Sequence, residues 1–238
     1  MGEPELRARL DIPELTPYAL AVRVGSGIER GMRLRYPGRP GTRPLRPTRN
    51  KVKQAIVNAL RARIPGARVC ELFAGTGALG IELLSAGAGS VVFVEQDRRT
   101  VRCLRENLAR FGDRAQVVAG DVRRVISRLV GPFDIVLADP PYGLGLNALT
   151  EELVAEHGLL AADGILVVEH GRRDEAEIPP GLSLVRCYRY GDTLVSVFRS
   201  VDGQVDIPLG KIGTVQSQRG QSLFSEAEKR DSPHSEKG

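Results

Sequence analysis

Cysteine and histidine are scarce in this chain of 238 residues, and the few that occur follow no disulfide or metal-binding pattern. The three cysteines, Cys70, Cys103 and Cys187, are odd in number and widely spaced, and no C-x-x-C pair occurs among them. The three histidines are equally scattered. The sequence therefore favours neither a disulfide framework nor a metal site, and we expect the protein in a reducing cytoplasm.

Long apolar runs are also missing from the sequence. No run approaches the roughly 20 residues that a membrane-spanning helix requires. The start of the chain, MGEPELRARLDIPEL, mixes charged and apolar residues instead of forming the apolar stretch of a signal peptide. A myristoylation signal needs Ser or Thr at position 6, where this chain has Leu6. We therefore expect neither export nor attachment to a membrane.

Acidic residues are nearly absent from residues 19–68. This segment holds 13 Lys and Arg residues against one acid, Glu29, and so carries a formal charge of +12. The whole chain has a net charge of +5 and a sequence pI of about 9.4, so the remainder is acidic. A positive field concentrated in one segment favours a polyanionic partner such as nucleic acid. The alternative is a basic face that only keeps the protein soluble.

From Arg68 onward, apolar runs alternate with amphipathic segments in the manner of a parallel α/β sheet. The first five predicted strands are residues 68–73, 90–95, 116–119, 134–138 and 165–169. Two further runs, 182–190 and 193–198, are separated by Gly191 and Asp192 and predict an antiparallel hairpin. The expected fold class is α/β, with a Rossmann-like, seven-stranded and mostly parallel sheet.

Composition divides the chain into four regions. They are a flexible leader at 1–18, a basic extension at 19–62, the α/β core at 63–200, and a polar, disordered tail at 201–238. In the extension, residues 19–35 predict a short β-hairpin with a cationic face, an irregular basic loop being the alternative. Thr48 is the expected N-cap of a helix. Four residues share the apolar face of that helix: Val52, Ile56, Ala59 and Leu60.

A glycine signature, Gly75-x-Gly77-x-x-Gly80, lies between the first predicted core strand and the next helix. Glycines in this context let the backbone approach a nucleotide cofactor closely. Binding of NAD is one interpretation, because Glu95 at the end of the next strand suits the hydroxyl groups of a nucleotide ribose. An NAD-dependent oxidoreductase therefore stays open at this point.

Two acids favour S-adenosylmethionine over NAD. Glu71, just before the glycine loop, can meet the positively charged methionine end of that cofactor, whereas it would repel a pyrophosphate. Asp121 follows the third strand, where an adenine amine needs an acceptor, although it can equally serve as an N-cap. We predict S-adenosylmethionine as the cofactor, with Phe73 and Asp139 among its contacts.

The sequence Asp139-Pro140-Pro141-Tyr142 ends the fourth strand, at the edge where open α/β sheets bind ligands. An exocyclic base amine is a weak nucleophile because its lone pair is delocalised into the ring. The Asp139 carboxylate and the Pro140 carbonyl can accept its two hydrogens, and Tyr142 offers a flat face for an extruded base. A strand-ending turn is the alternative, but the register with the glycine loop favours methyl transfer to such an amine.

With these motifs in place, the chain resembles the RsmD family of bacterial small-subunit rRNA (guanine-N2) methyltransferases, from about Val22 to Arg199. The likeness lies in Arg46-Pro47-Thr48, ELFAGTGALGIELLSAGA, VVFVEQD, Asn107-Leu108, LADPPY and the YGDT that begins at Tyr190. It implies a class I methyltransferase core behind a small N-terminal extension. It also selects guanine N2, whereas the Asp-Pro-Pro-Tyr loop by itself suits adenine N6 or cytosine N4 equally well.

The resemblance also implies roles for individual residues. For the cofactor they are Glu71, Gly75, Gly77, Glu95 and Asp121; for the chemistry, Asp139 and Tyr142, with Pro140 added from the loop itself. Phosphate contacts are expected from the extension, at Arg43, Arg46, Thr48, Arg49, Lys51 and Lys53, and RNA binding should weaken as salt rises. The family has a Thr-Asp-Arg-Val-Arg-like stretch where this chain reads Arg49-Asn50-Lys51-Val52-Lys53, which removes an acid.

The expected partner is ribosomal RNA or an assembling small ribosomal subunit, bound by a monomer that needs no metal. An alternative of another class is a non-catalytic RNA-binding or assembly factor that keeps a methyltransferase shape. The complete set of cofactor-site acids and glycines argues against that alternative. Two further residues have simple interpretations. Glu169 is either a solvated strand end, which we favour, or a neighbour of the active site, and Cys70 is a small buried hydrophobic residue.

Overall fold

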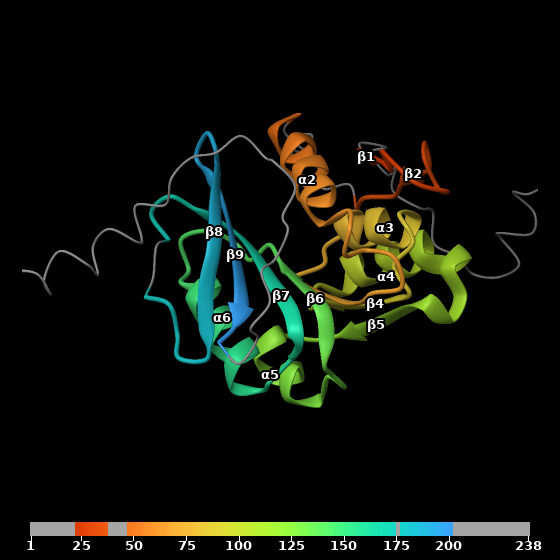
Figure 1. The fold of residues 1–238 in the computed structure, drawn as a ribbon. Helices are drawn as coiled ribbons and strands as arrows, with labels where there is room; N and C mark the ends of the chain where they lie inside the picture. Colours follow the sequence, from red (N-terminus) through yellow and green to blue (C-terminus); the bar gives the residue numbers. More distant parts are fainter. Residues whose placement is uncertain (1–21, 38–46, 175–176, 202–238) are drawn as a thin grey trace, which may run out of the picture.

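The computed structural model describes residues 22–37, 47–174 and 177–201. A seven-stranded sheet is flanked by helices on both faces, with a two-stranded hairpin at one side (Figure 1). The sheet contains β3 (Arg68–Leu72), β4 (Ser90–Glu95), β5 (Ala115–Ala119), β6 (Phe133–Ala138), β7 (Leu160–Gly171), β8 (Leu182–Tyr190) and β9 (Thr193–Ser200). The helices are α2 (Pro47–Leu60), α3 (Ala78–Ser85), α4 (Arg98–Leu108), α5 (Val122–Val125) and α6 (Leu146–Glu156), and the hairpin is β1 (Val22–Arg23) with β2 (Arg33–Leu34).

The strands of the sheet follow the order β5-β4-β3-β6-β7-β9-β8. The first five are parallel, and β9 and β8 are antiparallel to their neighbours. The predicted α/β class and C-terminal hairpin are therefore confirmed. The chain moves outward from β3 to β4 and β5 and then returns to the other side of β3 as β6. Open sheets bind ligands at such a reversal, which here lies between the ends of β3 and β6.

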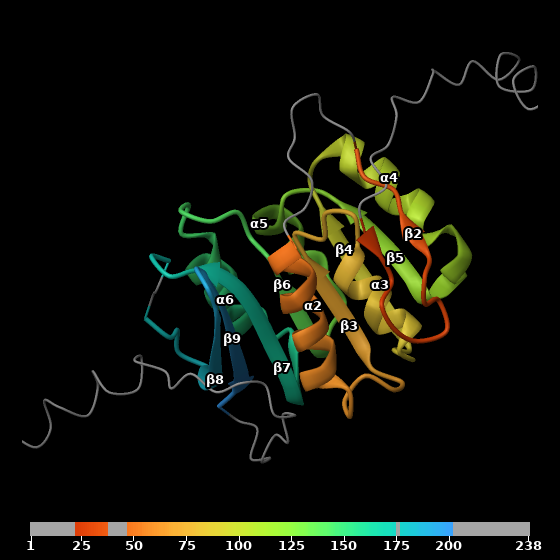
Figure 2. The same ribbon diagram turned by 90° about the horizontal axis from the view of Figure 1, so that it is seen from above.

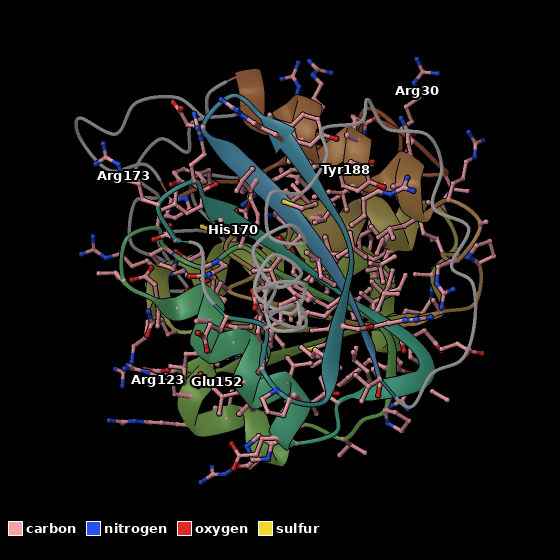
Figure 3. All side chains as sticks on the ribbon, turned by 60° about the vertical axis from the view of Figure 1, so that its left-hand side comes forward. Arg30, Arg123, Glu152, His170, Arg173 and Tyr188 are labelled. Carbon is pink, nitrogen blue, oxygen red and sulfur yellow. The ribbon has the colours of Figure 1, made fainter. Side chains whose placement is uncertain are left out.

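Both faces of the sheet are buried, as the apolar strands require. Along β6, Ile135 and Leu137 pack into the core beneath α2, α3 and α4, while Val136 and Ala138 pack on the opposite face beneath α5 and α6. Tyr188 is enclosed on the first of these faces. In Figure 3 exposed arginines such as Arg30, Arg123 and Arg173 extend away from this body.

Helix α2 attaches the N-terminal extension to the core. The predicted apolar face is confirmed, since Val52, Ile56, Ala59 and Leu60 are all buried. The prediction that Thr48 caps the helix is wrong, because the helix already begins at Pro47. Proline suits the first helical position, where its missing N–H is not needed and its fixed φ is already helical. The predicted boundary after residue 62 falls in the segment between α2 and β3.

The predicted hairpin in residues 19–35 is present as β1 paired with β2, with Val22 opposite Leu34. Buried polar groups of α3 hold it. Glu82 accepts hydrogen bonds from the backbone N–H groups of Gly25 and Ser26, and Ser85 Oγ donates to the Ser26 carbonyl at 2.6 Å. Figure 2 shows the hairpin lying over α3 and α4. The extension is thus mounted on the helix that begins at the glycine loop.

β7 is the strand that differs most in length from its prediction, and α5 is the shortest of the described α-helices. α5 is a single turn of four residues followed by a 3-10 turn at Ile126–Arg128, and β7 begins five residues before the predicted 165–169 and ends two residues after it. The predicted leader at 1–18 and the tail from residue 202 lie outside the described residues. Among the helices that are described, none is long and apolar enough to cross a membrane.

Candidate active site

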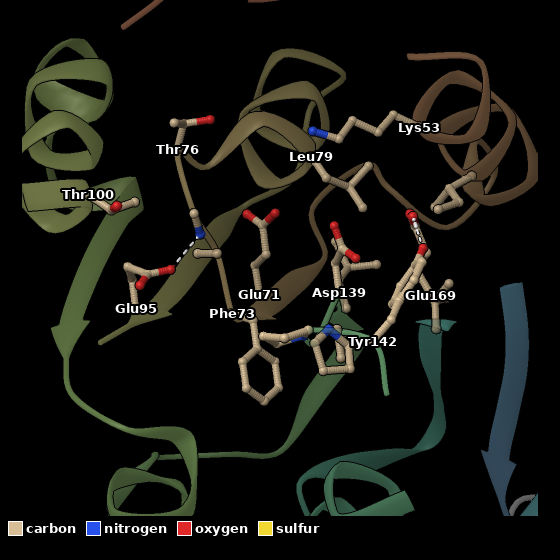
Figure 4. A pocket seen from close by; sticks show the side chains of 18 of the residues that line it. Lys53, Glu71, Phe73, Thr76, Leu79, Glu95, Thr100, Asp139, Tyr142 and Glu169 are labelled. Carbon is tan, nitrogen blue, oxygen red and sulfur yellow. Dashed lines mark hydrogen bonds between the residues drawn. The ribbon is translucent and has the colours of Figure 1, made fainter. Parts of the chain in front are cut away.

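A cavity of about 510 Å³ opens at the carboxyl ends of β3, β4, β6 and β7. Figure 4 shows its lining side chains. The lining brings together eight of the residues predicted from sequence: Lys53, Glu71, Phe73, Gly75, Glu95, Asp139, Pro140 and Tyr142. Among these eight, Lys53 and Tyr142 are 89 positions apart in the chain and yet line the same space.

The register of the sheet explains why the two predicted motifs meet. Leu72 at the end of β3 lies opposite Ala138 at the end of β6. The next residues, Phe73 and Asp139, therefore leave the sheet side by side. Phe73 has a φ of +56°, in the left-handed region that costs a residue with a side chain roughly 1–2 kcal/mol. Strain of this kind persists where the surroundings enforce it, and here it turns the chain from β3 into the glycine loop.

Two glycines of the signature, Gly77 and Gly75, have different functions. Gly77 has a φ of +77°, and a Cβ there would lie 2.5 Å from Leu104 Cδ1, so this glycine serves the packing of α3 and does not line the cavity. Gly75 has a φ of +57°, and a Cβ there would meet no atom within 4 Å. The space beside Gly75 belongs to the cavity, which suits the close approach of a cofactor.

Glu95 organises the glycine loop as well as lining the cavity. Its Oε2 accepts a hydrogen bond from Gly75 N at 2.8 Å, which Figure 4 marks, and its Oε1 accepts one from Asp97 N at 2.8 Å. The Glu95 carboxylate thus fixes the glycine loop next to the part of the cavity where we predict the ribose. Binding of the ribose hydroxyls by Glu95 stays a prediction.

Glu71 is the buried charge of the site. It is 7% exposed, and its Oε2 accepts a hydrogen bond from Gly80 N at 3.0 Å. Burial raises the pKa of Glu71 to about 7, opposed mainly by the positive charge of Lys53. Lys53 reaches from α2 over the cavity, with its ammonium group above Glu71 in Figure 4. A cationic ligand would stabilise the ionised form of this buried carboxylate, because its charge compensates for the solvation that burial removes.

The charge balance of the lining is strongly acidic. Among the described residues the cavity has four carboxylates and one cationic side chain, that of Lys53. The carboxylates are those of Glu71, Glu95, Asp139 and Glu169. Such a lining suits a ligand with positive charge or with several N–H donors.

Tyr142 is held by Glu169, for which the favoured prediction was a solvated strand end. Its hydroxyl donates a hydrogen bond to Glu169 Oε1 at 2.7 Å and lies 3.4 Å from Thr193 Oγ1. Burial, reinforced by the negative charges of Glu169 and Asp139, raises the pKa of Tyr142 well above its usual range, so the hydroxyl stays a donor. Tyr142 is still 41% exposed, which leaves ring surface available for stacking.

The interpretation of Glu169 as a solvated strand end is wrong, because Glu169 is only 6% exposed. β7 continues to Gly171, and its pairing with β9 keeps Glu169 inside the sheet, opposite Val195. A signal was present in the sequence, since Glu169 follows an apolar strand as Glu95 and Asp139 do.

A second residue missed from the sequence, Asp174, ties the loop after Tyr142 to β7. Its Oδ1 accepts from Gly143 N at 2.9 Å and its Oδ2 from Gly171 N at 3.2 Å. Its backbone carbonyl accepts from Asn147 Nδ2 of α6 at 2.6 Å. The aromatic residue of the Asp-Pro-Pro-Tyr loop is therefore fixed on both sides by the end of β7.

A smaller cavity of about 150 Å³ adjoins the first. The two share Phe73, Glu95, Asp139 and Pro141 in their linings, so the space continues toward Gly120 after β5. The adenine end of the predicted cofactor would lie in this smaller cavity.

Asp121 itself performs the helix-capping function that the sequence left open. It accepts a hydrogen bond from Arg123 N at 2.9 Å and pairs with the Arg123 side chain. The hydrogen bond from the Arg123 side chain lowers the pKa of Asp121. Asp121 lines neither of the two cavities, although its neighbours Gly120 and Val122 line the smaller one. Its contact with adenine stays a prediction.

The residues predicted to bind RNA lie mostly beyond what can be placed. Arg43 and Arg46 fall outside the described residues. Thr48, Arg49 and Lys51 lie in α2, where only their backbone is described. Lys53, the remaining member, lines the cavity, where its positive charge acts on Glu71.

Comparison with known proteins agrees with this geometry. The family model described as Conserved hypothetical protein 95, which is the RsmD family model, matches residues 22–199. The chain belongs to the RsmD family. As expected for this family, the RsmD-type chain has the class I methyltransferase fold, with its C-terminal antiparallel hairpin.

Individual relatives of this RsmD-family protein cover most of its length. YlbH of Bacillus subtilis is 34% identical over 187 residues, which is 75% of this chain and 98% of YlbH. The protein named ribosomal RNA small subunit methyltransferase D of Escherichia coli is 34% identical over 165 residues, 69% of this chain and 79% of that protein. The solved structure of yhhF from Escherichia coli has a TM-score of 0.67 at 32% identity and covers 75% of this chain and 97% of yhhF.

Proposed function

We propose that this protein transfers a methyl group from S-adenosylmethionine to the N2 amine of a guanine in small-subunit ribosomal RNA. The observation that carries the proposal is the convergence of Asp139, Pro140 and Tyr142 with the glycine loop and Glu71 around one cavity. The names of relatives add the substrate class, because one of them is a ribosomal RNA small subunit methyltransferase. We expect the protein to meet this substrate in the cytoplasm.

The residues of the site suit the cofactor. The open space beside Gly75 accepts its methionine part, Glu71 offers a negative charge to its cationic end, and Glu95 offers oxygen atoms to its ribose. The smaller cavity beyond Phe73 accepts its adenine. When bound, S-adenosylmethionine supplies a methyl group that its sulfonium sulfur makes electrophilic.

The chemistry of the protein is mainly one of positioning. Asp139 and the Pro140 carbonyl accept the two hydrogens of the amine and turn its lone pair toward the incoming methyl group. Tyr142 stacks on the extruded base. As the nitrogen–carbon bond forms and the carbon–sulfur bond breaks, the amine becomes positively charged and acidic. One of its protons then leaves to Asp139 or to water, so no strong base is needed.

The choice of guanine rests on the family resemblance. The same loop can serve adenine N6 or cytosine N4, so the product has to be identified chemically. The basic extension, residues 19–62, supports an RNA partner, because it holds 11 Lys and Arg residues against one acid and its formal charge of +10 attracts phosphates.

The test is transfer of labelled methyl groups to small ribosomal subunits that lack this modification, followed by digestion to nucleosides. Wild-type protein should yield N2-methylguanosine. Asp139→Ala should lose at least about a hundredfold in rate, because it removes an acceptor made for the transition state. The isosteric Asp139→Asn keeps an acceptor oxygen but loses the negative charge, so its loss should be smaller. Asp113→Ala, at an exposed position outside the cavity, is the matched control and should retain full activity.

Other outcomes separate the alternatives. N6-methyladenosine as the sole product would refute guanine and keep the enzyme class. Absence of binding to S-adenosylhomocysteine in calorimetry would favour a non-catalytic assembly factor. Cofactor binding without transfer to the subunit would direct the search to transfer RNA or DNA.

A further inference from the structure

Glu169 is a buried carboxylate that the mechanism above does not use. It lines the cavity, it is 6% exposed, and it lies on β7 beside the aromatic residue on which the base is expected to stack. Figure 4 shows Tyr142 standing between Asp139 and Glu169. Because Asp139, Tyr142 and Glu169 line one cavity, a base that binds there against Tyr142 has two carboxylates in its surroundings.

The hydrogen bond from Tyr142 does not exhaust what Glu169 can do. An ionised carboxylate has about four acceptor positions, so it can bind the Tyr142 hydroxyl and a ligand donor together. Holding a tyrosine ring alone does not require an acid, since a neutral acceptor serves as well. A carboxylate at the cavity wall has a second use if the ligand offers it an N–H group.

The bases differ at the position next to the amine that is methylated. In guanine, the N2 amine has N1–H as a neighbour, and both groups donate. In adenine the N6 amine is next to N1, and in cytosine the N4 amine is next to N3; both ring nitrogens carry a lone pair and no hydrogen. A carboxylate opposite that position attracts guanine and repels adenine and cytosine.

We propose that Glu169 is the specificity-determining residue of this site and accepts a hydrogen bond from N1–H of the target guanine while Asp139 accepts from its N2 amine. The inference rests on the proposed function and explains, from residues of this chain, why guanine is chosen over the other two bases. Glu169 does not take part in methyl transfer itself. A site with a buried carboxylate at this position rejects bases whose ring nitrogen presents a lone pair, because the two acceptors repel each other.

The experiment compares guanine with 2-aminopurine at the methylated position of the small-subunit RNA. 2-Aminopurine keeps the N2 amine but has an unprotonated N1. Wild-type protein should prefer guanine in kcat/KM by roughly 10- to 100-fold, the range for hydrogen bonds to charged groups. Glu169→Gln should lose activity on guanine and narrow or reverse this preference, because its amide can donate to an unprotonated N1.

Tyr142→Phe is the matched control. It removes the hydrogen bond to Glu169 but keeps the ring, so it should lower kcat/KM for the two bases by the same factor and leave their ratio unchanged. The affinity of each variant for S-adenosylhomocysteine should equal that of wild type, which separates base recognition from damage to the cofactor site.

The inference and the proposed function fail in different ways. If wild-type protein methylates guanine but shows no preference over 2-aminopurine, the role of Glu169 is refuted without recourse to any variant. If Glu169→Gln lowers both substrates equally, as Tyr142→Phe does, Glu169 only positions Tyr142 and the inference is again wrong. If wild-type protein forms no N2-methylguanosine at all, the proposed function itself fails.

Discussion

The Asn107 amide pairs with the backbone of Arg35 in the manner of a neighbouring strand. Its Oδ1 accepts from Arg35 N at 2.8 Å and its Nδ2 donates to the Arg35 carbonyl at 3.0 Å. The same Nδ2 donates to the Thr76 carbonyl in the glycine loop at 3.0 Å. Asn107 is 3% exposed, so one buried side chain joins the end of the N-terminal hairpin to the cofactor loop.

Replacement of Asn107 by aspartate should therefore damage two regions together. The new carboxylate would keep the acceptor but lose both donors, which leaves two carbonyls facing a buried charge. We expect Asn107→Asp to lower the free energy of unfolding by about 2–3 kcal/mol and to weaken binding of S-adenosylhomocysteine. Urea denaturation and calorimetry measure the two effects. Arg105→Ala, an exposed change on the same helix, should alter neither by much; an unchanged cofactor affinity in Asn107→Asp would contradict the link.

Glu71 should make the stability of the protein depend on pH. Its pKa of about 7 in the folded state lies above the value of 4.5 for an unperturbed carboxyl group. The folded state thus binds the proton more tightly, and the resulting stability, present below about pH 4.5, is lost as pH rises to about 7. Glu71→Gln should stabilise the ligand-free protein by up to about 3 kcal/mol at pH 8 and by little at pH 5. Thermal unfolding at the two pH values tests this, and equal shifts would show that Glu71 is not the group responsible.

The affinity for the cofactor should rise as Glu71 loses its proton, whereas the stability of the ligand-free protein falls. A cationic ligand prefers the ionised form of Glu71, so binding below about pH 7 has to displace a proton. We expect the affinity for S-adenosylmethionine to fall by up to about tenfold between pH 7 and pH 6. In Glu71→Gln the affinity should be weaker at pH 8 and nearly independent of pH. Calorimetry in buffers of different ionisation enthalpy would also detect the released proton.

Tyr142 should tolerate loss of its hydroxyl better than loss of its ring. Base stacking on an aromatic side chain contributes about 1–3 kcal/mol, and the ring is the part that the proposed mechanism uses. We expect kcat/KM to fall about tenfold in Tyr142→Phe and by about a hundredfold or more in Tyr142→Ala. Single-turnover methylation of small subunits measures both. Equal losses in the two variants would place the function of Tyr142 in its hydroxyl.

The glycines of the signature should separate folding from ligand binding. Gly77→Ala places a methyl group 2.5 Å from Leu104 Cδ1 at a φ of +77°, and should lower the free energy of unfolding by about 2–4 kcal/mol. Gly75→Ala meets open space, so its cost in stability should be limited to about 1–2 kcal/mol of backbone strain. It should nevertheless weaken cofactor binding more than ten times, because the methyl group enters the cavity. Parallel unfolding and binding measurements distinguish the two patterns.

Local features of the sequence sufficed for the order of strands and helices and for the two chemical motifs. The period of apolar residues determines which segments become strands or helices, and parallel strands bring their carboxyl ends to one edge. The glycine loop and the Asp139 loop could therefore be predicted to meet. Helix ends were less predictable: Thr48 looks like a cap, but Pro47 fits the first turn.

The tertiary structure alone decided the features that depend on contacts between residues far apart in the chain. Glu169 looks like a strand end until β9 pairs along β7 and buries it against Tyr142. Asn107 is an ordinary polar residue of a helix until Arg35, 72 positions away, is placed beside it. The sequence by itself determined the family, the fold and most of the residues that line the candidate site. Burial and hydrogen-bond partners depend on which distant segments pack together, so the structure was needed to find Glu169 and Asp174, which hold Tyr142 and the loop that follows it.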